Sequence, residues 1–351
     1  MKTTTLIATF YVLFLLGCSD DISNASETST GDEWLIPANE VLEGGPGKDG
    51  IPALTTPDFI PASEASYLSG NDLILGFVDG DDIRAYPHAI LDWHEIINDQ
   101  TPNHVPAIIY CPLTGTGIGW NRKTDGNTTT FGVSGLLYNS NIIPYDRATD
   151  SNWLQLHLKS VNGKLAGDSA ETFNLIETTW KTWKEMFPST RVVSTNTGYN
   201  RSYGEYPYGN YKENNELIFS VNNEDDRLHK KERVLAVIIG EKARAYRFED
   251  LGDNGNLFTD EFAGAEMVIT GNTEASLMVA FKSTLSDGTS LEFEIIEDQL
   301  PAILTDREGN TWDVTGKAID GPRKGEKLEP VTQIMGYWFG FAAFYPEIEL
   351  Y

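Results

Sequence analysis

The chain has 351 residues, 40% of them hydrophobic, so it is long enough to bury one large core or two ordinary ones. It carries 52 acidic against 26 basic side chains, which gives a formal net charge of −26. A surface this acidic repels phosphate backbones, so the composition argues against nucleic acid as a partner. It is typical of a protein that stays soluble in an extracellular setting.

The N-terminus has the pattern of a bacterial lipoprotein signal. Lys2 precedes an apolar run over residues 6–16, which is too short to span a bilayer and is typical of a signal peptide. The sequence Leu15-Leu-Gly-Cys18 resembles a lipobox, whose cysteine is acylated, for example with palmitate. Residues 1–18 are therefore predicted to be a lipoprotein signal peptide, with Cys18 holding the mature protein in the outer membrane. The acidic triplet Ser19-Asp-Asp21 resembles a signal for export to the cell surface.

Residues 19–50 are rich in Ser, Thr, Asn, Glu and Gly, and they are predicted to be a flexible tether between lipid and folded domain. If Cys18 carries lipid, Cys111 is the one thiol that remains in the sequence. No intramolecular disulfide can then form, and chemistry that needs two cysteines of one chain is excluded. A lone thiol in an oxidising compartment is either buried and inert or has a function.

An internal repeat runs through the rest of the sequence. Gly80-Asp-Asp-Ile-Arg-Ala-Tyr86 recurs as Gly240-Glu-Lys-Ala-Arg-Ala-Tyr246 at an offset of 160 residues, and Trp183 matches Phe341 at an offset of 158. A period this long indicates a duplicated domain rather than a solenoid. We therefore expect each copy to contain its own core.

The predicted fold is α+β and mostly β, with two fused homologous β-rich domains and a few short helices. The first domain spans residues 51–195 and carries the candidate site, and the second, structural domain spans residues 231–351. Between them, residues 196–230 form a Tyr-rich loop with no counterpart in either copy. Such a loop either binds a ligand or clamps the two copies together.

Strands are expected over residues 73–78 and 234–239, each followed by a tight turn and a short returning strand. A helix is expected over residues 87–99, because proline is favoured in a first helical turn. Apolar residues at i, i+3 and i+7 predict two more helices, which begin near Trp180 and Trp338 and turn an aromatic stripe toward the core.

The candidate site begins where a predicted strand ends on Cys111 and breaks into Pro, Leu, Thr and Gly. Gly115 can take a positive φ, so neighbouring N–H groups can converge on an anion or a polarised oxygen. His94 lies on the apolar face of the predicted helix and points into the protein, where it could also be an ordinary core histidine. A thiol beside an imidazole can act as a nucleophile with the imidazole as its base, or the pair can bind a soft metal ion.

Differences between the two copies favour the first as the site of any chemistry. Cys111 falls opposite Gly271, and the region that matches His94 contains no histidine. Turn chemistry is the structural alternative for the polar residues that also lack a counterpart. The candidate ligand-binding residues are Thr114, Gly115, Thr116, Asn139, Tyr145 and Gln155.

Four motifs of this sequence are informative together. They are the stretch around Cys111, Asp92-Trp-His-Glu-Ile-Ile-Asn-Asp99, Leu136-Leu-Tyr-Asn-Ser140 and Tyr145-Asp-Arg147. In these motifs the chain resembles the bacterial exported family known as domain of unknown function 3179. The resemblance covers residues 51–351 and implies no settled activity. It also implies that many relatives have a second cysteine where this chain has Thr114. A further family motif resembles residues 227–234, which makes His229 a candidate metal ligand with His94 and Cys111.

The leading hypothesis is a cell-envelope lipoprotein that binds a small ligand, or a soft metal ion such as copper, at Cys111 and His94 with residues 199–211 as a lid. The first alternative is a thiol-dependent enzyme with Cys111 as nucleophile, His94 as base and the N–H groups of residues 114–116 as an oxyanion hole. A structural or adhesion lipoprotein is the second alternative, favoured if Cys111 is buried with no cavity beside it. The expected partners are the membrane, through the N-terminal lipid, and the ligand or metal ion.

Overall fold

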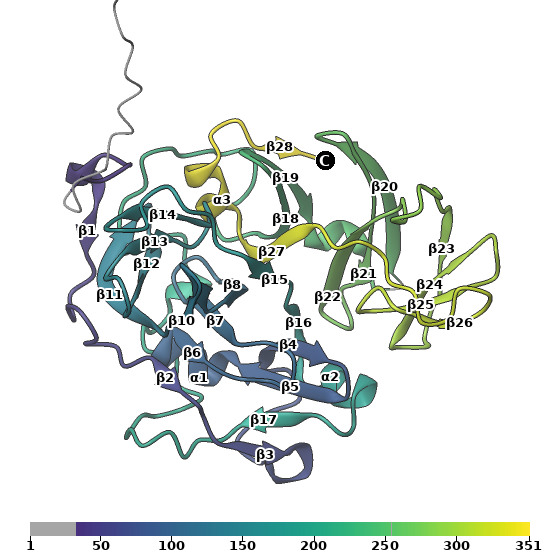
Figure 1. Cartoon of the computed structure of the whole chain (residues 1–351), viewed down its shortest axis with the longest axis horizontal. Coiled ribbons are helices and arrows are strands. Elements are labelled where there is room, and N and C mark those ends of the chain that lie inside the picture. The colour runs from purple at the N-terminus through teal and green to yellow at the C-terminus, as the bar shows by residue number, and fades with distance from the viewer. Residues whose placement is uncertain (1–32, 254) are drawn as a thin grey trace, which may run out of the picture.

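The computed structural model describes residues 33–253 and 255–351, and strands dominate it (Figure 1). The predicted mostly β fold with a few short helices is confirmed. The three α-helices of the described residues are α1 (His88–His94), α2 (Trp180–Met186) and α3 (Trp338–Phe344). Short 3-10 turns are η1 (Ala38–Glu40), η2 (Ala62–Glu64), η3 (Tyr211–Glu213) and η4 (Phe248–Leu251).

The predicted signal peptide and Cys18 lie outside the described residues. In the part of the chain that the structure describes, none of the helices has the length and apolar character that crossing a membrane requires.

Three sheets and a small hairpin belong to the N-terminal half. The first sheet has the order β16 (Ile176–Thr179), β4 (Leu73–Asp79), β5 (Asp82–Pro87), β17 (Arg191–Val193), β3 (Phe59–Pro61). The second has the order β15 (Thr172–Phe173), β8 (Thr116–Asn121), β7 (Pro106–Cys111), β6 (Ile96–Asn98), β2 (Leu54–Thr55). The third has the order β1 (Leu42–Glu43), β11 (Phe131–Tyr138), β12 (Asn141–Asp146), β13 (Asn152–Leu154), β14 (Lys159–Asn162), and the hairpin pairs β9 (Lys123–Thr124) with β10 (Asn127–Thr128).

The C-terminal half has three sheets. The first has the order β27 (Thr332–Tyr337), β18 (Arg233–Ile239), β19 (Lys242–Arg247), β28 (Glu349–Leu350). The second has the order β20 (Asn256–Phe262), β21 (Ala265–Asn272), β22 (Leu277–Lys282). The third has the order β23 (Phe293–Ile295), β24 (Ala302–Asp306), β25 (Thr311–Asp313), β26 (Ala318–Asp320).

The first sheets of the two halves have the same connections. The hairpins β4–β5 and β18–β19 turn at Gly80 and Gly240, which have φ of 64° and 62°. Antiparallel neighbours β16 and β27 each lead directly into an aromatic helix, and β17 and β28 each return parallel to the second hairpin strand. Duplication stays an interpretation, and this recurring arrangement favours it.

Two of the apolar core clusters cross the boundary between the two halves. One contains Cys111 together with Trp338 and Phe341 of α3, and the other contains Trp183 of α2 together with Trp312 of β25. Two further clusters each lie within one half, so each half has a core of its own and also shares a core with the aromatic helix of the other half. We expect the halves to depend on each other for stability.

The folded part begins earlier than the sequence indicates. Residues 33–50, assigned above to a flexible tether, lie against the N-terminal half (Figure 1). Leu42 pairs with Leu137 across β1 and β11, and the Tyr145 hydroxyl donates a hydrogen bond to Asp49. Apolar side chains such as Trp34 provide the burial that holds this segment in place.

Helix α1 ends at His94, so the predicted helix over residues 87–99 is too long. Pro87 caps its start as expected, but Glu95 has a φ of 57° and the chain continues as β6. The β-branched side chains of Ile96 and Ile97 are both fully buried in the sheet, which helical geometry on one face would not allow. The early end places His94 and Glu95 next to β7.

Candidate functional site

Cys111 ends β7 in a fully buried position. Its Sγ lies 3.7 Å from the carbonyl oxygen of Ser140, to which the thiol donates. Burial raises the pKa of the Cys111 thiol to about 11, although hydrogen bonds from Thr114 and from the Ile142 backbone oppose that rise. The Cys111 thiol is therefore protonated at neutral pH in this structure.

The charge of Glu95 also raises the pKa of the Cys111 thiol. The carbonyl oxygen of Glu95 accepts a hydrogen bond from the Tyr110 N–H at 2.8 Å, which fixes the end of α1 to β7. The side chain is 4% exposed, and its Oε2 has no hydrogen-bond partner. Burial raises the pKa of Glu95 to about 8, so the carboxyl group is largely neutral at pH 7.

A small cavity of about 30 Å³ lies beside Glu95. Leu113 and Ile142 line it from the Cys111 side, and Tyr208 and Phe219 cover it from the Tyr-rich loop. This volume suits one water-sized guest. A larger guest would require the Tyr-rich loop to move.

His94 is buried, as predicted, but it does not contact Cys111 through a hydrogen bond. Its Nδ1 lies 2.7 Å from the carbonyl oxygen of Pro52, and its Nε2 lies 2.6 Å from the Tyr203 hydroxyl. A carbonyl can only accept, so Nδ1 carries the proton and the neutral ring accepts from Tyr203 at Nε2. Burial also lowers the pKa of His94. The geometry therefore holds His94 as a neutral packing residue and not as the base of Cys111.

Thr114, Thr116 and Gln155 form a buried network next to Cys111. The Thr116 hydroxyl donates to Gln155 Oε1 at 2.7 Å and lies 2.8 Å from the Thr114 hydroxyl. Gln155 Nε2 donates to the carbonyl oxygens of Ile109 and Thr116 at 2.9 and 3.0 Å. The polar groups of these candidate ligand-binding residues are hydrogen-bonded to one another and to the backbone. These hydrogen bonds fix the loop that follows Cys111.

The other candidate ligand-binding residues have structural contacts. Asn139 has a φ of 50° in the two-residue turn of the β11–β12 hairpin, and its side chain donates to the carbonyl oxygen of Ala343 at 3.2 Å. Gly115 has a φ of 62°, which favours glycine, and it packs against the ring of Tyr337, which would have to shift to accommodate a side chain. Tyr145 bonds Asp49 at the N-terminal segment.

The candidate metal ligands do not gather. His229 is exposed, whereas His94 and Cys111 are fully buried. Within residues 33–253 and 255–351, no three His, Cys, Asp or Glu side chains are grouped in a way that could hold a metal ion.

We call residues 205–219 the lid segment, because they cover Cys111 and the loop after it. The hydroxyl groups of Tyr206 and Tyr211 donate to the carbonyl oxygens of Pro112 and Leu113, each at 3.0 Å. The carbonyl oxygen of Phe219 accepts from the Ser140 hydroxyl. Every one of these bonds ends within a few residues of the buried thiol or on the turn that contacts it.

Comparison with known families places the chain. A family model described as a protein of unknown function (DUF3179) matches residues 48–348. The chain belongs to the DUF3179 family. Neither a curated protein nor a solved structure matches it. The family is described as one of unknown function, so the function of this DUF3179 protein is inferred below from the geometry of its candidate site.

The structure of this DUF3179 protein adds a polar cluster that sequence reasoning missed. Asp92 is buried, which raises its pKa, and it lies 3.3 Å from Lys212 of the lid segment. His88 lies 3.3 Å from Glu177, whose carboxylate also pairs with Arg233 of the C-terminal half. The cluster therefore joins the lid segment and both halves.

Some sequence signals could have pointed to these residues. Asp92 and Glu95 stand in the same motif as His94, but a helix continued to residue 99 would have turned them away from Cys111. Glu177 lies in a strand with no distinguishing pattern, so only the fold reveals it.

Proposed function

We propose that this DUF3179 protein is a cell-envelope lipoprotein that binds a small polar ligand in the cavity beside Glu95, next to the loop that follows Cys111, with the lid segment closing over it. The observation that supports this most is the unpartnered Oε2 of Glu95, which is buried at a cavity that the lid segment covers. Buried polar groups nearly always have partners, and leaving one without costs about 1–3 kcal/mol. A ligand or a water that donates a hydrogen bond would remove that cost.

The chemistry of the centre indicates a hydrogen-bond donor as the ligand. Glu95 offers an acceptor oxygen, and Tyr208 provides an aromatic face at the same cavity. A small primary amine or alcohol would satisfy both, because an amine donates to the carboxyl group and a cation also attracts an aromatic face. The lid segment would open for entry, since the cavity of about 30 Å³ is too small for such a molecule.

Thermal unfolding in the presence of methylamine, ethanolamine and ethylene glycol tests this proposal. A ligand at about 100 times its Kd should stabilise the protein by about 2.7 kcal/mol, and Glu95→Leu, which removes the acceptor oxygen, should abolish the effect. Glu213→Leu, an exposed change within the lid segment, is the matched control. If every stabilising compound acted equally on wild type and Glu95→Leu, the cavity beside Glu95 would not be the binding site.

A thiol-dependent enzyme is a second candidate, with Cys111 as nucleophile. The hydrogen bonds that Thr114 and Ile142 direct at the thiol favour it, because they stabilise the thiolate. Above about pH 8, where the Glu95 carboxyl is ionised, Glu95 would replace His94 as the group that accepts the thiol proton when the sulfur attacks a carbonyl carbon. Incubation with p-nitrophenyl acetate should then release nitrophenolate and leave one acetyl group on Cys111. Nitrophenolate release by wild type no faster than that by Cys111→Ser would exclude this activity.

A further inference from the structure

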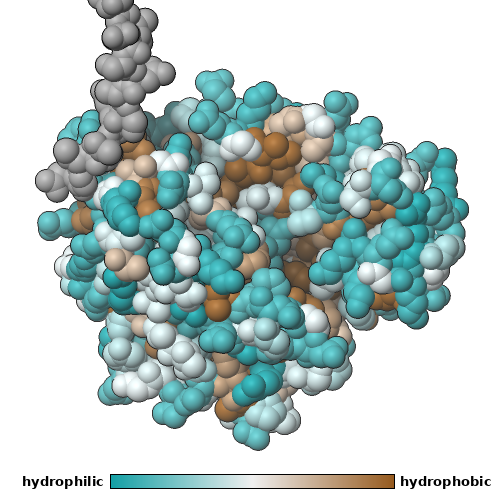
Figure 2. Space-filling model, in the orientation of Figure 1, coloured by the Kyte–Doolittle hydropathy of each residue, from teal (hydrophilic) through white to brown (hydrophobic). Residues whose placement is uncertain are grey.

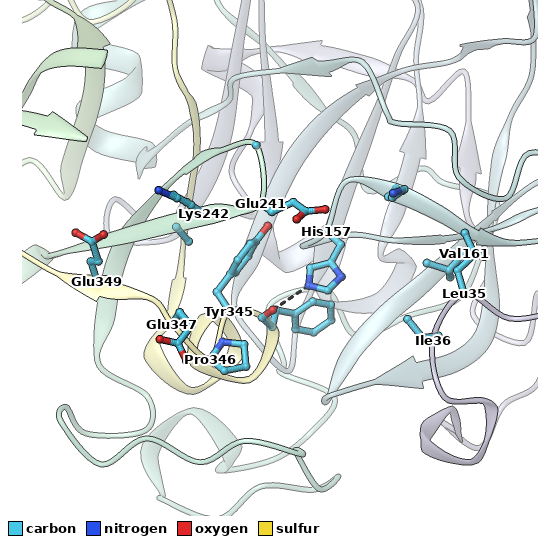
Figure 3. A pocket seen from close by; sticks show the side chains of 14 residues that line it. Leu35, Ile36, His157, Val161, Glu241, Lys242, Tyr345, Pro346, Glu347 and Glu349 are labelled. Carbon is cyan, nitrogen blue, oxygen red and sulfur yellow. Dashed lines mark hydrogen bonds between the residues drawn. The ribbon is translucent and has the colours of Figure 1, made fainter. Parts of the chain in front are cut away.

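A second cavity, much larger than the one beside Glu95, opens between the two halves (Figure 3). Its volume is about 660 Å³, which is within the range of about 300–1,000 Å³ that ligand cavities occupy. The N-terminal half contributes His157 and Val161, the turn between β18 and β19 contributes Glu241, and the C-terminal end of α3 contributes Phe344. Junctions of this kind are common ligand sites.

The floor of this cavity is apolar. Val161, Ala243 and Phe344 are buried along it, and Leu35 leaves 52% of its surface exposed at the edge. Figure 2 shows the matching hydrophobic surface in a hollow near the position of α3 and β19. Covering apolar surface of this kind is worth roughly 25 cal/mol per Å². The floor would therefore accept an apolar side chain.

His157 places one acceptor in the middle of this apolar surface. Its Nε2 lies 2.8 Å from the carbonyl oxygen of Phe344, so Nε2 carries the proton and Nδ1 has a free lone pair in the neutral ring (Figure 3). The ring also packs edge-on against Phe344 and Tyr345, with centroids 4.9 and 5.4 Å apart. Nδ1 is thus available to a ligand N–H group.

Charged side chains of both signs surround the apolar floor. Lys159, Lys242, Glu241 and Glu347 are all exposed at the rim, and none of the ion pairs formed within the described residues involves them. Glu349, by contrast, pairs with Arg244. Figure 3 shows Lys242, Glu347 and Glu349 on one side of His157, and Leu35, Ile36 and Val161 on the other. The rim can therefore bind an ammonium group and a carboxylate at once.

We infer that this cavity binds a short zwitterionic peptide with apolar side chains. The floor would hold the side chains, the free glutamates would bind the N-terminal ammonium group, and the free lysines would bind the C-terminal carboxylate. The preceding part of the chain itself does not fit as the occupant, because residues 19–32 are mostly Ser, Thr, Asn and acidic residues. The site is independent of Cys111 and Glu95.

Isothermal titration of the purified chain with phenylalanylphenylalanine tests the inference. Blocking both ends of the dipeptide, by N-acetylation and C-amidation, should weaken binding roughly tenfold or more, which corresponds to about 1.4 kcal/mol. Lys242→Glu and Glu347→Lys should each lower the affinity for the free dipeptide roughly threefold to tenfold, because each substitution replaces an attraction with a repulsion. Lys324→Glu, an exposed change on the C-terminal half outside the cavity, should leave the affinity unchanged.

Three results would overturn the inference: no binding of the free dipeptide by wild type, equal binding of the blocked dipeptide, or unchanged affinity in both rim variants. Glu95→Gln and Cys111→Ser should bind the dipeptide as wild type does. The two experiments are therefore independent. A negative result with amines would not contradict binding of the dipeptide, and a negative result with the dipeptide would not contradict binding of amines.

Discussion

Lys231 donates a hydrogen bond to the backbone carbonyl of Tyr211, and its ammonium group lies 3.4 Å from the centroid of the Tyr211 ring. The same group donates to the carbonyl oxygens of Asn214 and Glu216 at 2.8 and 2.9 Å. Lys231 is 8% exposed and stands just before β18. One buried cation therefore fastens the lid segment to the C-terminal half.

Replacing this cation should loosen the lid segment. In Lys231→Met the three carbonyl oxygens lose a charged donor, and hydrogen bonds to charged groups are worth about 1.5–3 kcal/mol each. We expect limited proteolysis within residues 205–219 to become roughly tenfold faster or more, since about 1.4 kcal/mol of easier opening gives a factor of ten. Lys230→Met is the control, because Lys230 forms a surface pair with Glu224 at 2.8 Å. Equal cleavage of the two variants would show that Lys231 does not hold the lid segment.

Glu95 should give the protein a specific pH dependence. Burial raises its pKa from 4.5 to about 8, so the folded protein retains a proton that the unfolded chain loses as pH rises above about 4.5. The stability that this proton contributes is fully present below about pH 4.5 and is lost progressively as pH rises from there through about 8, by up to about 5 kcal/mol.

Urea unfolding of wild type and Glu95→Gln at pH 5 and pH 8 measures this contribution. The variant cannot lose a proton at this position, so it should lose less stability between the two pH values than wild type does. Glu213→Gln should behave as wild type. An identical pH profile for Glu95→Gln and wild type would mean that the folded protein does not hold Glu95 as a neutral acid.

Trp183 should be more important to stability than Cys111. Trp183 is fully buried, packs against Gly76 and donates to the Thr190 hydroxyl at 2.9 Å. Its truncation to Ala should cost on the order of 3–5 kcal/mol, and because its core cluster includes Trp312 we expect one shared unfolding transition. Cys111→Ala should cost roughly 1 kcal/mol or less. The measurement is denaturant unfolding of both variants. If Cys111→Ala lowered the free energy of unfolding as much as Trp183→Ala does, Cys111 would be a packing residue.

Particular residues show how far the sequence determines the fold. The aromatic stripes of Trp180 and Trp338 correctly predict α2 and α3, since helical spacing of large apolar residues is a local signal. The end of α1 at Glu95 is not local, because the sheet that buries Ile96 and Ile97 overrides a continuous helical pattern. The motif around Cys111 predicts where the centre lies. Tertiary contacts determine three other features, which the spacing of residues in the sequence does not reveal. They are the position of Glu95, the hydrogen bonds that fix the His94 ring, and the attachment of the lid segment by Lys231.

Membrane attachment is tested separately from the site. If Cys18 is acylated, Cys18→Ala should move the protein from the membrane fraction to the soluble fraction or leave an unprocessed precursor. Fractionation followed by intact mass measurement distinguishes these forms. A Cys18→Ala protein that stayed in the membrane fraction at its mature size would exclude lipid attachment at this residue.

The most direct test of the buried centre is the labelling rate of Cys111 by iodoacetamide in native protein, measured at increasing urea below the unfolding transition. If the lid segment opens on its own, labelling should proceed with an opening free energy below that of global unfolding and with almost no dependence on urea. Lys231→Met should then label roughly tenfold faster. The contradictory result is labelling that follows the full urea dependence of global unfolding in both proteins, because Cys111 would then be exposed by unfolding alone.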